Sequence, residues 1–164
     1  MRTKEVVKRI YLSVSALLLW PLCLIKHRGS PEPGSIKEIL FLRHDRIGDM
    51  ALSLPAIRLL KNSFPHARLT VVASGSNKDI LSNNPYVDEV LVYNGMSDYI
   101  KHVRHRRFDL AIDPFHNNHE LKSAFITMLS GARYRIGFAL AGKEIFFPMK
   151  APLYDEKKSF MQLM

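Results

Sequence analysis

The apolar positions between residues 36 and 140 fall into short, nearly continuous runs that are separated by polar segments. Runs of this length, rich in Val, Ile, Leu and Phe, are typical of strands that are covered on both faces of a sheet. On this basis the sequence predicts five strands, at residues 38–43, 68–74, 89–93, 108–113 and 134–138.

The segments between these runs place apolar residues at helical spacing. Pro55 interrupts the first segment, which predicts either a kink or a helix that begins later than Asp49. Gly131 follows the last segment and is expected to end that helix as a C-cap glycine. The predicted helices occupy residues 49–64, 77–84, 96–107 and 120–131.

Strands that alternate with helices of this length favour βαβ units and therefore a parallel sheet with flanking helices. Ligands of such sheets bind at the carboxyl ends of the strands. That rule selects the loops after Arg43, Ser74, Tyr93 and Asp113 as the place to look for a site.

Residues 10–25 form an uncharged apolar stretch of 16 residues with basic residues on both sides. A spanning helix needs about 20 apolar residues, and Pro21 interrupts this one. The residues that follow are basic rather than small, which does not fit a signal-peptide cleavage site. Three alternatives stay open: a helix that lies on the membrane surface, a short span, or a helix packed on its own domain.

We therefore divide the chain into a membrane-associating segment (1–30), a linker (31–36), a folded α/β domain (37–150) and a tail (151–164). The formal net charge is +9, and residues 1–30 hold six Lys or Arg against one Glu. This placement of charge beside an apolar stretch favours an anionic membrane surface over nucleic acid. The single cysteine, Cys23, excludes an intrachain disulfide and fits a reducing compartment.

The loop after the first strand concentrates charge between a buried strand and a helix. Asp45, Arg46, Gly48 and Asp49 follow directly on Arg43. With a single glycine, the loop does not have the fingerprint of a dinucleotide site. A purely structural interpretation makes Asp49 the helix N-cap and pairs Asp45 with Arg46 in solvent. A functional interpretation makes Asp49 a general base that activates a sugar hydroxyl, with the two arginines binding an anionic substrate.

These segments, in this order and spacing, resemble the N-terminal half of the family 9 glycosyltransferases, which include the ADP-heptose:lipopolysaccharide heptosyltransferases. The resemblance covers about residues 36–140 and is strongest over the strand, Arg-x-Asp-Arg-Ile-Gly-Asp and the Leu-Pro-Ala of the following helix. It implies a Rossmann-like acceptor-binding domain, the N-terminal domain of a GT-B fold, preceded here by the apolar segment. It also implies inverting sugar transfer without a metal or cofactor, from a nucleotide sugar such as ADP-heptose to the lipopolysaccharide core.

The resemblance matches the family's catalytic aspartate to Asp49. It also matches a basic residue after the fourth strand to Lys122, with Ser123 beside it, and a strand-end aspartate to Asp113. In the same loop, His116 is a candidate to hydrogen-bond the acceptor rather than to bind a metal; the alternative is an exposed loop residue with no role in binding. The predicted acceptor-binding residues are Arg43, Asp45, Arg46, Gly48, Asp113, His116, Lys122 and Ser123.

Members of that family are about twice as long, and the sequence after Phe138 shows no second set of strands and helices. We therefore expect this chain to lack the nucleotide-sugar domain and to be inactive by itself. Its expected place is the cytoplasmic face of a Gram-negative inner membrane. The alternative is a non-catalytic membrane-associated module that binds an anionic glycolipid or a protein partner.

Overall fold

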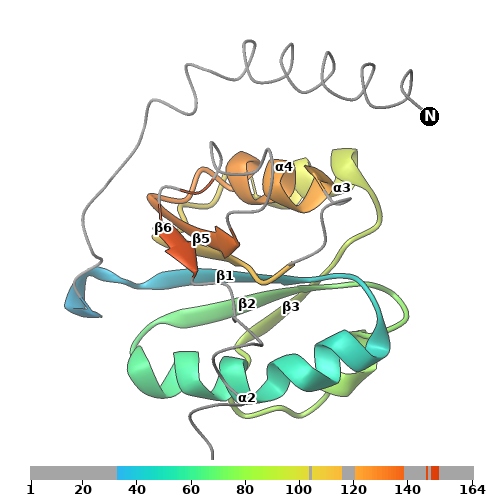
Figure 1. Cartoon of the computed structure of the whole chain (residues 1–164), viewed down its shortest axis with the longest axis horizontal. Helices are drawn as coiled ribbons and strands as arrows, with labels where there is room; N and C mark the ends of the chain where they lie inside the picture. The colour runs from blue at the N-terminus through green and yellow to red at the C-terminus, as the bar shows by residue number, and fades with distance from the viewer. Residues whose placement is uncertain (1–32, 104, 116–120, 139–146, 148, 152–164) are drawn as a thin grey trace, which may run out of the picture.

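The computed structural model describes residues 33–103, 105–115, 121–138, 147 and 149–151. These residues form one parallel sheet of six strands in the order β3-β2-β1-β4-β5-β6, which is the classical Rossmann order. In Figure 1, α2 covers one face of the sheet, and α3 and α4 cover the other. The elements are η1 (Pro33–Ser35), β1 (Glu38–Arg43), α2 (Ile47–Ser63), β2 (Arg68–Ala73), η2 (Lys78–Leu81), β3 (Glu89–Val92), α3 (Met96–Val103), β4 (Leu110–Asp113), α4 (Leu121–Leu129), β5 (Tyr134–Phe138) and β6 (Met149–Ala151).

Strand β1 lies at the centre of the molecule because both of its faces are apolar. Ile39 and Phe41 belong to the core under α2, whereas Leu40 and Leu42 belong to the core under α3 and α4. Alternate residues of a strand point to opposite faces, so a continuous apolar run fills both cores at once. The predicted Rossmann-like α/β fold is confirmed.

The structure corrects the predicted start of α2, its N-cap and the number of strands; in addition, α3 ends at Val103 and β4 begins at Leu110. Helix α2 begins at Ile47 and continues through Pro55, so a start later than Asp49 is wrong. The N-cap position belongs to Arg46, which makes no side-chain cap, and Asp49 is the third residue of the helix. The sixth strand was not predicted; β6 pairs with β5 in parallel and forms the edge of the sheet.

The predicted C-cap at Gly131 is confirmed by its φ of +66°, a backbone conformation that favours glycine. Residues 1–30, predicted to associate with a membrane, lie outside the described residues. Within the described part of the chain, no helix is long and apolar enough to cross a membrane.

Candidate functional site

The loops at the carboxyl edge of the sheet contact one another, as parallel topology predicts. The Ser74 hydroxyl, after β2, donates to the Asp45 carbonyl oxygen at 3.3 Å. The ring of His44, after β1, lies 4.8 Å from the ring of Tyr93, after β3, and 5.2 Å from that of Phe115, after β4. Segments that are distant in the sequence therefore meet around the loop that follows β1.

Arg43 forms ion pairs with two aspartates at this edge, and its side chain is only 9% exposed. One terminal nitrogen lies 3.5 Å from a carboxylate oxygen of Asp45, and the other lies 3.6 Å from a carboxylate oxygen of Asp49. Its Nε also donates to the Asp49 carbonyl oxygen at 3.1 Å, and the guanidinium lies over the Phe115 ring. Arg43 therefore links the end of β1 to the first turn of α2.

Asp49 stands in the first turn of α2, with its side chain 36% exposed. The Asp49 carbonyl oxygen accepts hydrogen bonds from Arg43 Nε and from the Ser53 hydroxyl. The backbone of this residue is thus fixed while its carboxylate stays open to solvent, as a group that meets a substrate must be.

Asp45 is the more buried of the two carboxylates, with a side chain 17% exposed. Burial raises the pKa of this carboxyl; the Arg43 charge acts in the opposite direction, and the nearby Asp49 carboxylate raises the pKa further. The two carboxylates therefore repel each other, and both form an ion pair with the Arg43 guanidinium.

Asn77 is a fully buried member of the site that the sequence analysis missed. Its amide nitrogen donates to the carbonyl oxygens of Arg43, at 2.9 Å, and Asp45, at 3.3 Å, and its oxygen accepts from the Ser74 N–H. These bonds hold the loop after β1 against the loop after β2. In the sequence, the sign of such a role was an Asn that follows Gly75 by two positions, in the loop after the buried strand β2.

Arg46, in the loop, and Gly48, in the first turn of α2, are both exposed. Among the described ion pairs, Asp45 is joined to Arg43 and not to Arg46, so the structural interpretation that paired Asp45 with Arg46 is wrong. Of the two arginines predicted to bind the acceptor, Arg46 has its side chain in solvent and Arg43 is buried. Arg46 is therefore the better placed of the two for an anionic ligand.

The predicted residues after β4 are less accessible or lie outside the description. Asp113 is 1% exposed and accepts a hydrogen bond from the Phe115 N–H, and Ser123 is fully buried. Their burial gives no support to direct acceptor contact, which stays a prediction. His116 lies outside the described residues, as does the side chain of Lys122, whose backbone is in α4.

Among the described residues, no three His, Cys, Asp or Glu side chains gather as a metal site would require. The expectation of chemistry without a metal or cofactor stays a prediction.

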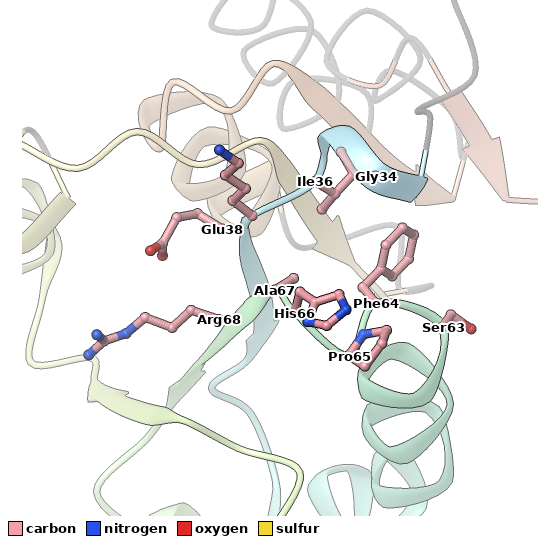
Figure 2. A pocket seen from close by; sticks show the side chains of 10 residues that line it. Gly34, Ile36, Glu38, Ser63, Phe64, Pro65, His66, Ala67 and Arg68 are labelled. Carbon is pink, nitrogen blue, oxygen red and sulfur yellow. The ribbon is translucent and has the colours of Figure 1, made fainter.

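A pocket of about 540 Å³ lies at the opposite, amino-terminal edge of the sheet (Figure 2). It is lined by residues from the start of β1 and from the α2–β2 connection, including Glu38, Phe64 and His66. Because ligands of parallel sheets bind at carboxyl ends, its size alone does not make this pocket the functional site.

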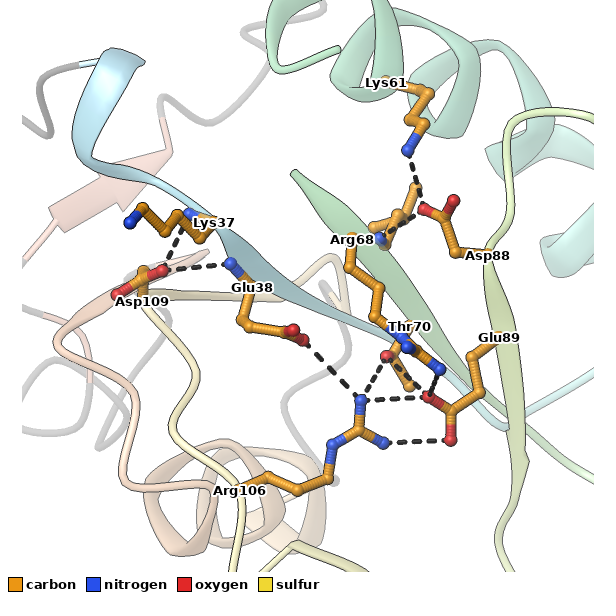
Figure 3. Close-up of polar contacts among 10 residues, drawn as sticks. Lys37, Glu38, Lys61, Arg68, Thr70, Asp88, Glu89, Arg106 and Asp109 are labelled. Carbon is orange, nitrogen blue, oxygen red and sulfur yellow. Dashed lines mark hydrogen bonds and ion pairs between the residues drawn. The ribbon is translucent and has the colours of Figure 1, made fainter. Parts of the chain in front are cut away.

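The same amino-terminal edge is held by ion pairs (Figure 3). Arg106 contacts Glu38 at 3.7 Å and Glu89 at 2.9 Å, and it donates to the Thr70 hydroxyl at 3.0 Å. These contacts tie β1, β2 and β3 together where they begin. The two edges therefore differ. At the amino edge the charged side chains join neighbouring strands to one another. At the carboxyl edge the Asp49 carboxylate and Arg46 are exposed to solvent.

Known proteins resemble this chain in sequence and in fold. No protein-family model matches the chain. A Haemophilus influenzae protein named "Putative glycosyltransferase" is 28% identical over 118 residues, which cover 68% of this chain and 33% of the relative. The chain thus spans about a third of the length of the curated relative it matches.

Two solved structures share the fold. The glycosyl transferase family 9 protein from Veillonella parvula has a TM-score of 0.64 at 19% identity, covering 77% of this chain and 38% of that one. The E. coli ADP-heptose lps heptosyltransferase II has a TM-score of 0.62 at 24% identity, covering 73% and 36%. The predicted resemblance to the family 9 glycosyltransferases is confirmed: the chain shares the fold of a family 9 structure, and its sequence is similar to that of a protein named as a glycosyltransferase.

Proposed function

We propose that this chain is the acceptor-binding half of an inverting, heptosyltransferase-like glycosyltransferase, with Asp49 as the general base. The observation that carries the proposal is the Asp49 carboxylate, which is exposed at the carboxyl edge of the sheet while a buried arginine fixes its position. A sugar hydroxyl becomes a competent nucleophile when a positioned carboxylate withdraws its proton in the transition state. The similarity to a glycosyltransferase of Haemophilus influenzae and the shared fold support this assignment.

In this mechanism the Asp49 carboxylate accepts the proton of the acceptor hydroxyl as its oxygen attacks the anomeric carbon of the donor. The nucleoside diphosphate leaves with the bonding electrons, and the anomeric centre inverts. Arg43 holds the carboxylate, and Arg46 is placed to bind a phosphate of the acceptor through its exposed guanidinium. The donor is a nucleotide sugar of the ADP-heptose type, and the acceptor is the lipopolysaccharide core at the cytoplasmic face of the inner membrane.

The donor site belongs to a second domain in this proposal, so the 164 residues bind acceptor but do not transfer sugar by themselves. Calorimetry with phosphorylated core oligosaccharide should show binding to the chain. A mass-spectrometric assay with ADP-heptose and core lipid should show no product. Product formed by the chain alone would overturn the assignment of a half-enzyme.

The role of Asp49 is tested in a protein that carries both halves. Asp49→Asn should lower kcat about 100- to 10,000-fold while the acceptor Kd changes less than about twofold. Asp79→Asn, at an exposed aspartate of η2, is the matched control and should leave both constants unchanged. If Asp49→Asn weakens binding in proportion to turnover, or changes neither, the chain is better described as a non-catalytic glycolipid-binding module.

A further inference from the structure

The connection between β3 and α3 contains an Asn-Gly pair that is open to solvent. Strand β3 ends at Val92 and α3 begins at Met96, so Asn94 and Gly95 lie directly before the helix. Asn94 is exposed, and Gly95 has a φ of +120°, a backbone conformation that residues with a side chain rarely adopt. The turn therefore requires glycine after Asn94, and a glycine has no side chain to shield the peptide bond that joins them.

The two groups of this pair that can react with each other are not held by strong hydrogen bonds. Among the described residues, the Gly95 N–H has no acceptor. The Asn94 side-chain nitrogen donates to a carboxylate oxygen of Asp98 at 3.4 Å, which is long for a hydrogen bond. The Gly95 nitrogen can therefore approach the side-chain carbonyl carbon of Asn94.

The other described asparagines lack this combination of features. Asn77 is fully buried, and its amide takes part in three hydrogen bonds. Asn62 lies in α2, where the helical hydrogen bonds hold the backbone N–H groups. The N–H that follows Asn83 donates to the Leu81 carbonyl oxygen at 3.1 Å, and Asn84 is followed by a proline, which has no N–H.

We infer that Asn94 is a site of spontaneous covalent modification, at which the side-chain amide is hydrolysed through a cyclic imide. The Gly95 nitrogen loses its proton to solvent and attacks Cγ of Asn94. The Cγ–Nδ2 bond breaks, and ammonia leaves with a proton taken from water. A water molecule then opens the imide at one of its two C–N bonds and leaves aspartate or isoaspartate at this position. One water is consumed and one ammonia is released, so the reaction needs no oxidant, cofactor or enzyme.

The product places a second negative charge at the start of α3. The Asn94 amide that donates to Asp98 becomes a carboxylate, and Asp98 lies in the first turn of the helix. Two carboxylates at this distance repel each other. Isoaspartate also lengthens the backbone before α3 by one atom. Both products should therefore loosen the hydrogen bond from the Tyr99 N–H to the Gly95 carbonyl oxygen, now 3.0 Å long.

The loosened turn belongs to a chain of aromatic contacts that reaches the candidate site. The Tyr99 ring lies 6.2 Å from the ring of Tyr93, which lies 4.8 Å from the ring of His44. Modification of Asn94 therefore acts on the connection that places Tyr93 against the loop after β1. The reaction itself does not depend on sugar transfer.

Mass spectrometry of the full chain tests this inference, because trypsin releases Asn94 together with its controls. The peptide from Asp79 to Lys101 has no internal Lys or Arg and contains Asn83 and Asn84 as well as Asn94. After incubation of the folded chain at pH 8, Asn94 should have lost its amide several times more often than Asn83. Asn84 should stay unchanged, and electron-transfer fragmentation should show isoaspartate at the position of Asn94.

Equal conversion of Asn83 and Asn94 in the folded chain would overturn the inference. So would loss of the amide from Asn94→Gln at the native rate, because glutamine cannot form the same five-membered ring. An intact Asn94 in the folded chain, under conditions in which a synthetic peptide of residues 79–101 is converted, would also overturn it, since the fold would then protect the site.

Hydrogen exchange tests the consequence for α3. In Asn94→Asp the Tyr99 amide should exchange severalfold faster than in the native chain. The matched control is Asn62→Asp, at an exposed residue of α2, which should leave the exchange of Tyr99 unchanged. The same exchange rate in Asn94→Asp and in the native chain would refute the effect on the first turn of α3. No sugar transfer enters these readouts, so failure here and failure of the proposed function are seen separately.

Discussion

Replacing Arg43 with methionine should destabilise the fold by about 2–3 kcal/mol, because it leaves two carboxylates without their shared cation. Breaking a buried ion pair by removing one partner costs about 3–5 kcal/mol when the remaining charge is fully buried. Asp45 and Asp49 are 17% and 36% exposed, so water partly rehydrates them and the expected cost is lower. Methionine keeps most of the apolar volume of the arginine stem, so little of the loss reflects a cavity.

The assay is urea denaturation followed by circular dichroism at pH 7, comparing midpoints at equal m-values. Arg43→Lys keeps the positive charge but removes the forked guanidinium and the hydrogen bond from Nε to the Asp49 carbonyl oxygen. Its free energy of unfolding should therefore fall by about 1 kcal/mol. Arg58→Met is the matched control, because Arg58 is exposed and stacks on Tyr86; it should lose about 0.5 kcal/mol. The effect at Arg43 should persist in 1 M salt, since buried pairs are weakly screened.

The pH dependence sharpens this prediction. Part of the cost of Arg43→Met arises from the Asp45 carboxylate, whose pKa is raised by burial. The cost should therefore shrink as the pH falls and Asp45 takes up a proton. If Arg43→Met loses no more stability than Arg58→Met, or loses the same amount at pH 4 as at pH 7, the proposed role of Arg43 in holding Asp45 and Asp49 is refuted.

Three further predictions concern the rest of the fold. Gly137→Ala should cost about 1–3 kcal/mol of unfolding free energy in the same assay, because an added Cβ would lie 2.7 Å from atoms of the buried Phe147 ring; a neutral result would contradict that packing. Tyr99→Phe should cost about 1 kcal/mol, since its buried hydroxyl donates to the Ile126 carbonyl oxygen at 2.9 Å; a loss below about 0.3 kcal/mol would argue against this bond. Burial alone would raise the pKa of Asp88, but hydrogen bonds from a backbone N–H and a lysine ammonium hold that pKa below its usual range. The Asp88 carboxylate therefore stabilises the fold above the pKa that it has in the unfolded chain. This stabilisation disappears as the pH falls through the lower pKa that it has in the folded protein. Asp88→Asn should therefore flatten the acid limb of the stability curve, and an unchanged limb would contradict the assignment.

The strands of the inner sheet were predictable because each is a short apolar run between polar segments. Strands β1 and β5 have the predicted bounds, and β2 and β3 end one residue earlier than predicted. The edge strand β6 has only three residues, with Lys150 at its centre, so it is not itself an apolar run. Its existence depends on pairing with β5, a long-range interaction that local pattern does not encode.

The start of α2 shows why helix boundaries were harder to predict than strands. Asp49 looked like a cap because aspartate is common at that position. The helix instead begins two residues earlier, at Ile47, so that Asp49 falls in its first turn. Proline lacks the N–H of an interior helical residue, yet Pro55 is retained because packing of Met50 and Ile57 on the sheet outweighs one lost hydrogen bond.

The roles of the two arginines could be separated only by tertiary structure. Arg43 and Arg46 are three residues apart and look equivalent as ligands for a phosphate. Arg43, however, is the last residue of a strand buried on both faces, so its side chain is enclosed by the loops that follow neighbouring strands. Two residues that contact the guanidinium, Pro114 through its carbonyl oxygen and Phe115 through its ring, are 71 and 72 positions away in the sequence.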